Sequence, residues 1–329
     1  MNILHVTNAW PDEKNPIRGI FIKEQIDSIR AEGIPVDVHV ISRLNGQGYI
    51  SSIKTLRSSS RNYEIIHAHH VLSALACILA GIPASRLVCS FLNERGKNIL
   101  GISPMISKTI ESFVVRKSGV CIYKNKSFDK IRRRNDLIMG NAVDPDRFYY
   151  ESKLSACKKL GLDPTLIYVL FVSANDLYRP AKRYDRFTEV IKLLQLDIPN
   201  VAALTLVNET RDRVPAFFNA SDLLLVCADH EGSPNAVKEA LACGIPVVST
   251  SVGDVAEQIR HISDCEIVSP FDPALAAAAA KRALASTTDR CYRRATYLAN
   301  ARAKENVAQA IISAYRFLKP VKTREHSDR

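Results

Sequence analysis

Short β-branched runs alternate with amphipathic stretches along most of this 329-residue chain. Alternation of this kind is typical of parallel sheets covered by helices on both faces. The stretch 19–33 shows the helical pattern, because its isoleucines recur near a 3.6-residue period and Gly33 can end a helix. Strands are predicted at 2–7, 35–42, 63–70, 86–91, 119–123 and 136–140, and again at 167–174, 201–207, 222–228, 245–251 and 265–269.

Turn residues and charges interrupt the alternation at 140–164. A chain of this length and 47% hydrophobic composition can form two domains, each with its own core. The sequence therefore predicts two Rossmann-like, doubly wound α/β domains, residues 1–150 and 151–300, that face each other across a cleft. A helix near 301–318 is expected to pack back on the first domain, and 319–329 to be a disordered tail.

The net charge of +11 is uneven, with basic residues concentrated in 115–134. This stretch has three interpretations: a solvated basic face, a contact for an anionic membrane surface or a phosphate-bearing substrate, or a nucleic-acid site. No recognised nucleic-acid motif supports the last of these, so no nucleic-acid partner is expected.

The cysteines and the apolar segments favour a cytoplasmic protein. The eight cysteines show no C-x-x-C pair, and most lie in apolar runs, which is typical of free thiols in a reducing compartment. The apolar stretch 71–82 is too short to cross a bilayer, and the chain starts on a strand pattern rather than a signal peptide.

The stretch "HEGSPNAVKEALACG", residues 230–244, carries the clearest chemical signal. Ser233 is a good N-cap, Pro234 suits the first helical position, and Gly244 can end the helix. Glu231 precedes this turn, whereas Glu239 lies about one and a half turns inside the helix. Since a strand comes directly before, the helix should begin at the carboxyl edge of a parallel sheet, where ligands bind.

A helix start at such an edge is an anion site, because its amides and the positive end of its dipole point outward. Gly232 would let the backbone approach a diphosphate closely. Glu239 could accept two hydrogen bonds from a ribose diol, and Glu231 would lie beyond the phosphates. The pattern predicts a nucleotide-sugar site; the alternative is that the two glutamates are a surface charge and a dipole partner.

Together with "GIPVVSTSVGDVAE", this stretch resembles glycosyltransferase family 4, the retaining nucleotide-sugar transferases of GT-B fold. Members carry the pattern E-G-x-P-x-x-x-x-E-A-x-A-x-G-x-P-V-V, and this chain reads "EGSPNAVKEALACGIPVV". Similar segments are "GNAVDPDRF" at 140–148, "YEIIHAHH" at 63–70, and 15–41. The resemblance covers roughly 1–315 and is most specific over 228–257.

The resemblance implies that the first domain binds the acceptor and the second the donor. It implies that Glu231 contacts the donor sugar, that Glu239 holds the ribose, and that Lys182 neutralises the departing diphosphate. Gly19 would let the first loop approach the donor phosphate and the acceptor. The remaining implied donor contacts are Gly232 and the backbone amides of Ser233, Asn235 and Ala236.

The chain departs from the family pattern in three places. The family's Gly-Arg pair is Ser173–Ala174 here, so its phosphate-binding arginine is missing, and Arg179 or Arg183 could replace it. One strand–helix unit is missing between 201–207 and 222–228, so the second domain should be somewhat trimmed.

The third departure concerns the acceptor side. No histidine follows 86–91, so none carries over as catalytic. Glu94 or Arg95 could face the acceptor instead, and His69 could contact the acceptor or donor or be a satisfied structural histidine.

Metal binding is not expected from either of two weak signals. "DPD" at 144–146 is explained by turn chemistry. His67 and His69 share one strand face, but no nearby segment offers further ligands. No dinucleotide fingerprint is present, so no obligatory cofactor is expected and the nucleotide-sugar is a substrate.

The expected function is transfer of a sugar, with retention, from a UDP- or GDP-linked donor to a glycan or lipid-linked acceptor. The expected setting is cell-surface polysaccharide biosynthesis at the inner face of the membrane. Two alternatives stay open: a non-catalytic nucleotide-sugar-binding partner of another transferase, and a nucleotide-sugar epimerase or hydrolase of the same fold.

Overall fold

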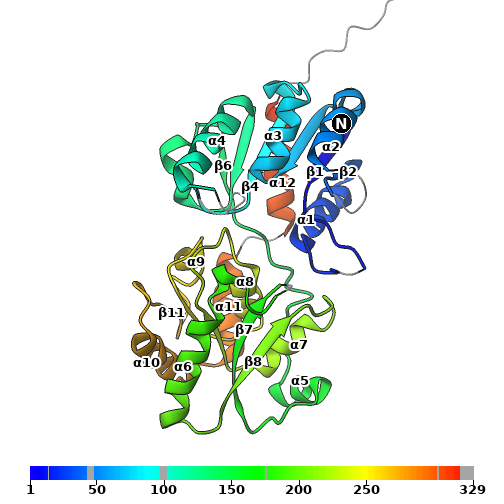
Figure 1. The fold of residues 1–329 in the computed structure, drawn as a ribbon. Helices are drawn as coiled ribbons and strands as arrows, with labels where there is room; N and C mark the ends of the chain where they lie inside the picture. Colours follow the sequence, from blue (N-terminus) through cyan, green and yellow to red (C-terminus); the bar gives the residue numbers. More distant parts are fainter. Residues whose placement is uncertain (14, 43–47, 97–101, 175, 302–303, 319–329) are drawn as a thin grey trace, which may run out of the picture. The chain divides into compact units, whose positions relative to one another are not determined.

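A computed structural model describes residues 1–13, 15–42, 48–96, 102–174, 176–301 and 304–318. The chain divides into two compact units, each built around one parallel sheet (Figure 1). The first unit contains Met1–Trp10, Phe21–Met139 and the chain from Glu305 onward; the second contains Pro11–Ile20 and Gly140–Lys304.

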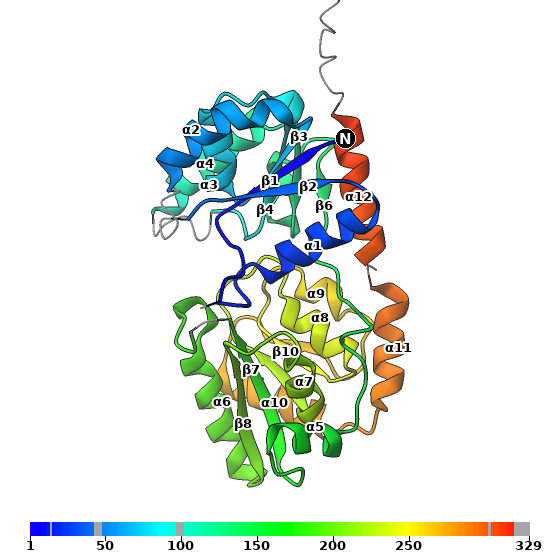
Figure 2. The ribbon, with the colours of Figure 1, turned by 90° about the vertical axis from the view of Figure 1, so that its right-hand side faces the viewer.

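The first unit has a six-stranded sheet in the order β2-β1-β3-β4-β5-β6. One face is covered by α2, α3 and α4, and the other by α1 and α12 (Figure 2). The strands are β1 (Ile3–Thr7), β2 (Val36–Val40), β3 (Ile65–His69), β4 (Leu87–Phe91), β5 (Val120–Tyr123) and β6 (Leu137–Ile138). The helices are α1 (Ile20–Ala31), α2 (Tyr49–Ser59), α3 (Val71–Leu79), α4 (Pro104–Lys117) and α12 (Lys304–Phe317), with short 3₁₀ segments η1 (Ser60–Asn62), η2 (Ala84–Arg86) and η3 (Lys126–Ile131).

The second unit has a five-stranded sheet in the order β11-β10-β9-β7-β8. Its core on one face involves α5, α7, α8 and α11, and on the other α6 and α10. The strands are β7 (Ile167–Ser173), β8 (Val201–Val207), β9 (Leu223–Val226), β10 (Val247–Ser249) and β11 (Glu266–Ile267). The helices are α5 (Lys153–Leu160), α6 (Tyr184–Asp197), α7 (Val214–Ala220), α8 (Asn235–Ala242), α9 (Val255–Gln258), α10 (Pro273–Leu284) and α11 (Arg290–Asn300), with the 3₁₀ segment η4 (Pro180–Lys182).

The predicted fold class is confirmed, because every predicted strand segment contains a strand and both sheets are parallel. The second sheet is also as short as predicted, since β8 leads directly into α7 and β9. Gly244 ends α8 as predicted, with a φ of 77° that favours glycine.

The boundary between the units differs from the predicted position near 150. It falls at Met139–Gly140, because Val143 and Phe148 are already buried in the core of the second unit. The segment Pro11–Ile20 groups with the second unit as well, although the sequence placed it in the first domain. The predicted tail at 319–329 lies outside the described residues.

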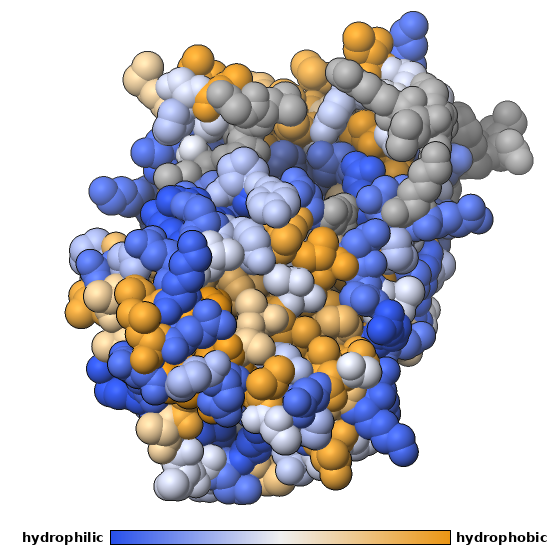
Figure 3. All heavy atoms as spheres, turned by 60° about the horizontal axis from the view of Figure 1, so that its bottom comes forward, coloured by the Kyte–Doolittle hydropathy of each residue, from blue (hydrophilic) through white to orange (hydrophobic). Residues whose placement is uncertain are grey.

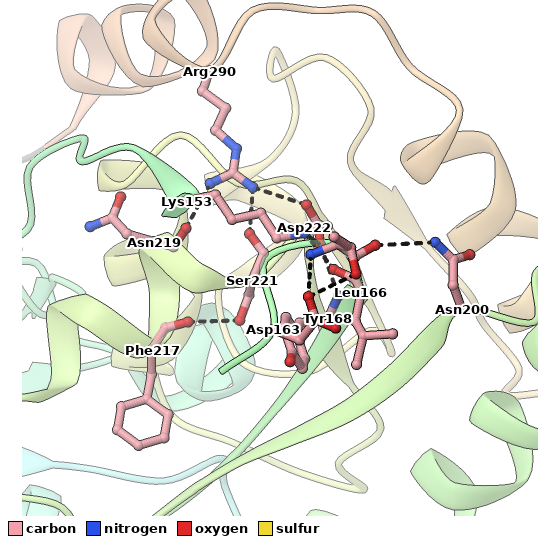
Figure 4. A network of polar contacts seen from close by, with 11 residues as sticks. Lys153, Asp163, Leu166, Tyr168, Asn200, Phe217, Asn219, Ser221, Asp222 and Arg290 are labelled. Carbon is pink, nitrogen blue, oxygen red and sulfur yellow. Dashed lines mark hydrogen bonds and ion pairs between the residues drawn. The ribbon is translucent and has the colours of Figure 1, made fainter. Parts of the chain in front are cut away.

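A charged network joins elements at the amino edge of the second sheet (Figure 4). Asp222, just before β9, accepts hydrogen bonds from the Tyr168 backbone N–H at 2.8 Å and from Lys153 Nζ at 2.6 Å. Lys153 also donates to the Leu166 carbonyl at 2.6 Å, and Arg290 Nη2 lies 3.5 Å from Asp222 Oδ1. The network therefore connects the starts of α5 and α11 to the starts of two central strands.

The surface in Figure 3 shows hydrophobic side chains interspersed with hydrophilic ones. Exposed large hydrophobic residues of the second unit include Leu154, Leu196 and Leu275. Scattered residues of this kind are normal on folded proteins. In the described part of the chain, no helix has the length and apolar character needed to cross a membrane.

Candidate functional site

Three loops meet at the carboxyl edge of the second sheet, opposite the Asp222 network. They follow the neighbouring strands β8, β7 and β9, and they carry Arg211, Lys182 and Glu231 respectively. A hydrogen bond of 3.0 Å from the Asp229 N–H to the Ala181 carbonyl ties the last two loops together. Ligands bind at this edge in open α/β sheets, so the charged side chains gathered here form the candidate site.

The first turn of α8 differs from the predicted cap. The helix begins at Asn235, with Pro234 at the N-cap position, and Ser233 makes no capping hydrogen bond. Ser233 Oγ instead accepts from the Asn141 backbone N–H at 3.0 Å and donates to Asp254 Oδ2 at 2.8 Å. The prediction of Ser233 as N-cap is therefore wrong, because buried polar partners from other segments engage its hydroxyl.

A buried lysine completes this group. Lys238 is only 2% exposed, and its ammonium donates to Ser233 Oγ and lies 3.5 Å from Asp254 Oδ2. A buried ammonium needs such partners, because an unpaired charge in the interior is costly. The group supports the loop before α8 from its buried side.

Gly253 brings a second loop against the same turn. Its φ is 56°, and an added Cβ would lie 2.6 Å from the Gly232 carbonyl oxygen. Any side chain at this position would push the two loops apart. The "GDVAE" segment therefore shapes the backbone of the Glu231–Gly232 turn.

The two motif glutamates are each paired with a cation from a neighbouring loop. Glu231 Oε1 lies 2.6 Å from Lys182 Nζ, and both side chains are about four-fifths buried, with 21% and 16% exposed. Glu239 Oε1 lies 2.6 Å from Arg211 Nη1. The sequence identified Glu231, Glu239 and Lys182 as site residues, but it missed Arg211, whose only local signal is its position in the loop that follows β8.

The first amides of α8 belong to Asn235 and Ala236, and helix geometry leaves such amides without intrahelical acceptors. Asn235 is further oriented by Asn141, whose side-chain amide donates to Asn235 Oδ1 at 2.9 Å. These predicted phosphate contacts thus lie at the start of a helix, as an anion site requires.

The two arginines considered as replacements for the missing family arginine lie after β7. Arg179 is exposed. Arg183 forms a hydrogen-bonded pair with Asp185 at 2.7 Å and contacts Asp229 at 3.3 Å, which raises its pKa above the usual value. Its charge is therefore balanced by two carboxylates.

In the first unit, His69 is a core residue, which fits the alternative of a satisfied structural histidine and corrects its placement among the acceptor contacts. It is 1% exposed, and its Nε2 is hydrogen-bonded to His5 Nδ1 at 2.8 Å. His67 is bonded to Ser90 Oγ at 2.8 Å and to the Tyr315 hydroxyl at 2.6 Å. The sequence could not anticipate His5 or Tyr315 as partners, because they lie at opposite ends of the chain.

These three histidines come close enough to be considered as a metal site, with ligand atoms within 4.8 Å of one another. Protein hydrogen bonds engage both nitrogens of His67 and both nitrogens of His5. Burial lowers the pKa of His5 to about 3 and that of His67 and His69 well below the usual value. We therefore interpret the cluster as a network of neutral imidazoles. Asp144, from the other weak metal signal, instead accepts from the Asp146 N–H at 3.1 Å in a turn.

The loop after β4 holds the other predicted acceptor residues. The Arg95 N–H donates to Ser127 Oγ at 2.9 Å, and Glu94 lines a small hollow with Glu111. Both Glu111 oxygens accept from the Gly96 N–H, at 3.0 and 2.9 Å. Gly19, the remaining predicted contact, has a φ of 67°.

The sequence comparison adds evidence for the second unit. A family model described as glycosyl transferases group 1 matches residues 180–286, which include Lys182, Glu231 and Glu239. The predicted resemblance to glycosyltransferases is confirmed. N-acetyl-alpha-D-glucosaminyl L-malate synthase of Bacillus anthracis is 21% identical over 233 residues, which is 61% of this chain and 60% of that protein. The match therefore spans less than two thirds of that relative.

Solved structures confirm the predicted GT-B type of fold. Sucrose-phosphate synthase from Thermosynechococcus elongatus superimposes with a TM-score of 0.73 at 13% identity, covering 97% of this chain and 99% of that one. Anabaena HepE, solved in complex with UDP and glucose, superimposes with a TM-score of 0.71 at 15% identity, covering 96% and 100%. At these identities the likeness establishes the fold alone.

Proposed function

We propose that this protein is a retaining family 4 glycosyltransferase that uses a UDP- or GDP-linked sugar. The acceptor is a glycan or a lipid-linked precursor of a cell-surface polysaccharide. The six exposed basic residues of 116–134 are the surface that would approach an anionic membrane from the cytoplasmic side: Arg116, Lys117, Lys126, Lys130, Arg132 and Arg134.

One observation carries the proposal: Glu231 and Glu239 flank the start of α8 at the carboxyl edge of a parallel sheet, each beside a cation. Amides at that helix start suit a diphosphate. A carboxylate further along the helix suits a ribose diol, and one before the turn suits a sugar hydroxyl. The same region matches the group 1 family model.

The proposed mechanism assigns a role to each of these groups. The acceptor hydroxyl attacks the anomeric carbon on the face from which the diphosphate departs, and its proton passes to the leaving phosphate oxygen. The amides of Asn235 and Ala236 and the Lys182 ammonium stabilise the charge that develops on the diphosphate. Glu231 orients the donor sugar and keeps Lys182 in place before transfer.

A thermal-shift panel of UDP, GDP, ADP and their sugars tests the donor site. A ligand at about 100 times its dissociation constant adds about 2.7 kcal/mol to the free energy of unfolding. We expect a shift with one base, and its loss in Glu239→Ala. Glu189→Ala, which changes an exposed glutamate of α6, is the matched control. No shift with any nucleotide would sink the proposal.

A second candidate is a nucleotide-sugar-binding partner without turnover. It is favoured by the missing family arginine, since Ala174 stands at the position of that arginine. Incubation with donor and a panel of acceptors separates the two. A transferase releases nucleoside diphosphate and forms a glycoside, whereas a binding partner is stabilised by nucleotide and releases none.

A further inference from the structure

We infer that Arg211 is a positioning residue that holds the Glu239 carboxylate for the nucleotide ribose and makes binding depend on the ribose 2′-hydroxyl. The inference rests on the proposed function, because it concerns the same donor site. Neither the family motif nor the sequence pattern assigned a role to this arginine.

Arg211 lies in the loop between β8 and α7, and Glu239 and Phe148 both contact its guanidinium. Its Nη1 atom is 2.6 Å from Glu239 Oε1, and its Cζ atom is 4.8 Å from the ring centroid of Phe148. The Arg211 side chain is 17% exposed and that of Glu239 is 7% exposed. The ion pair is therefore largely withdrawn from water.

The aromatic partner is rigid. Phe148 is fully buried in the core of the second unit and packs edge-on against Phe218, with ring centroids 5.9 Å apart. A planar guanidinium that stacks on such a ring has few orientations left. It consequently restricts the rotation of the carboxylate with which it is paired.

This arrangement has two chemical consequences for a bound nucleotide. A carboxylate has about four lone-pair positions, so the bond to Arg211 Nη1 takes up only a part of what Glu239 can offer to a vicinal diol. The guanidinium also balances the Glu239 charge, which would otherwise repel an approaching diphosphate. Recognition then depends on hydrogen bonds from the ribose hydroxyls, which 2′-deoxyribose cannot supply in full.

The same loop supplies a matched control. Arg213 pairs with Glu209 at 2.9 Å, and its side chain is 55% exposed. It has the same chemistry as Arg211 and lies two positions away, but it pairs with a glutamate of its own loop rather than with one on α8. Arg213→Gln should leave nucleotide recognition unchanged.

Isothermal titration calorimetry of the full chain with UDP, GDP and their 2′-deoxy analogues tests the inference. The wild type should bind the ribonucleotide at least about 10-fold more tightly than its 2′-deoxy analogue, the loss expected for one hydrogen bond to a charged group. In Arg211→Gln the ratio should fall below about threefold. Arg211→Lys keeps a cation beside Glu239 and so protects the fold, but it lacks the planar group that stacks on Phe148. Its preference for the ribonucleotide over the 2′-deoxy analogue should lie between those of the wild type and Arg211→Gln.

The outcomes separate the inference from the function beneath it. Wild type that binds neither UDP nor GDP refutes the proposed function. Wild type that discriminates, together with Arg211 variants that discriminate equally well, overturns the role of Arg211 alone. An equal loss of affinity for the ribonucleotide and for its 2′-deoxy analogue in the variants would also overturn the role of Arg211, because a merely structural arginine predicts that result.

Discussion

The two edges of the second sheet use the same residue types for different purposes. At the amino edge, Lys153 and Arg290 meet Asp222, and at the carboxyl edge, Lys182 and Arg211 meet the motif glutamates. The amino-edge cations also donate to backbone carbonyls, and Asp222 accepts from a backbone N–H. The amino-edge groups thus stabilise the fold, whereas the carboxyl-edge groups lie beside a helix start that suits a ligand.

The difference teaches that residue type and ion pairing do not by themselves identify a site. Parallel strands place all their outgoing loops at one edge, and this edge collects side chains that can face a ligand. The opposite edge receives the incoming connections, where pairing mainly secures the fold. Four substitutions test this contrast, in order of decreasing expected effect.

Lys182→Ala should lower turnover by about 10²- to 10³-fold, the usual effect of losing one group that stabilises developing charge. Nucleoside diphosphate release at saturating donor measures it. The thermal midpoint should also fall, because the substitution takes this cation away from the Glu231 carboxylate, which is only 21% exposed. Turnover is therefore compared well below the thermal midpoint of the variant. Lys192→Ala, an exposed lysine of α6, is the control. Unchanged turnover in Lys182→Ala would remove the catalytic role of this lysine.

Asp222→Ala should lower the free energy of unfolding by about 2 kcal/mol, because it leaves the Lys153 ammonium and the Tyr168 N–H without their acceptor. Urea denaturation measures the loss. The dissociation constant for nucleotide should stay within about twofold of wild type. A large loss of nucleotide affinity without a loss of stability would show that the amino edge, and not only the carboxyl edge, takes part in binding.

The third prediction extends the comparison to the carboxyl edge of the first sheet. Burial raises the pKa of Glu111 to about 7 from 4.5, and the folded protein therefore holds this proton more tightly than the unfolded chain. The free energy of unfolding is then highest below the unfolded pKa and falls as pH rises through about 7. We expect the free energy of unfolding to fall by about 1–2 kcal/mol as pH rises from the unfolded pKa of 4.5 to about 7.

Glu111→Gln isolates this effect, because its stability cannot depend on that proton. The buried histidines titrate with the opposite sign: their lowered pKa values stabilise the fold above about 6.5, and this stability is lost as pH falls through the lowered values, which for His5 is about 3. They are present in both proteins, so they cancel in the difference. Parallel stability curves for wild type and Glu111→Gln between pH 5 and 8 would contradict the shift.

Arg282→Ala should have the smallest effect, below about 0.5 kcal/mol. Arg282 pairs with Glu266 at 2.7 Å, but the two side chains are 61% and 43% exposed, and water and salt screen such pairs. Denaturant midpoints and nucleotide affinity should both match wild type. A loss of stability as large as that of Asp222→Ala would show that the exposed fraction of the side chains does not determine how much the Asp222 and Glu266 ion pairs stabilise the fold.

Much of the fold could be predicted from the sequence, because local periodicity reports which faces of each segment are buried. The isoleucines of α1 and the β-branched runs identified the elements. Glu231 and Glu239 could be located because a strand and a Gly-Ser-Pro turn signal stand close to them in the chain. Lys182 was located only through the family resemblance. The resemblance at 228–257 then supplied their expected roles.

The errors and omissions have one physical origin, which is contact between segments far apart in the chain. Ser233 has a good capping pattern, yet Asn141 and Asp254 compete for its hydroxyl. His69 could be a ligand contact or a structural histidine by sequence, and the hydrogen bond to the distant His5 decided for the second. Arg211 carried no motif at all, and only the neighbouring positions of β7, β8 and β9 bring it to α8.

The sequence by itself determined the alternation of strands and helices, the parallel sheets and the glutamates at the start of α8, because these depend on residues close together in the chain. The tertiary structure decided which charges meet at each sheet edge, where the boundary between the units lies, and which histidine is buried. Those outcomes depend on strand order and on side chains that compete for the same buried partners. Neither is encoded in any single segment.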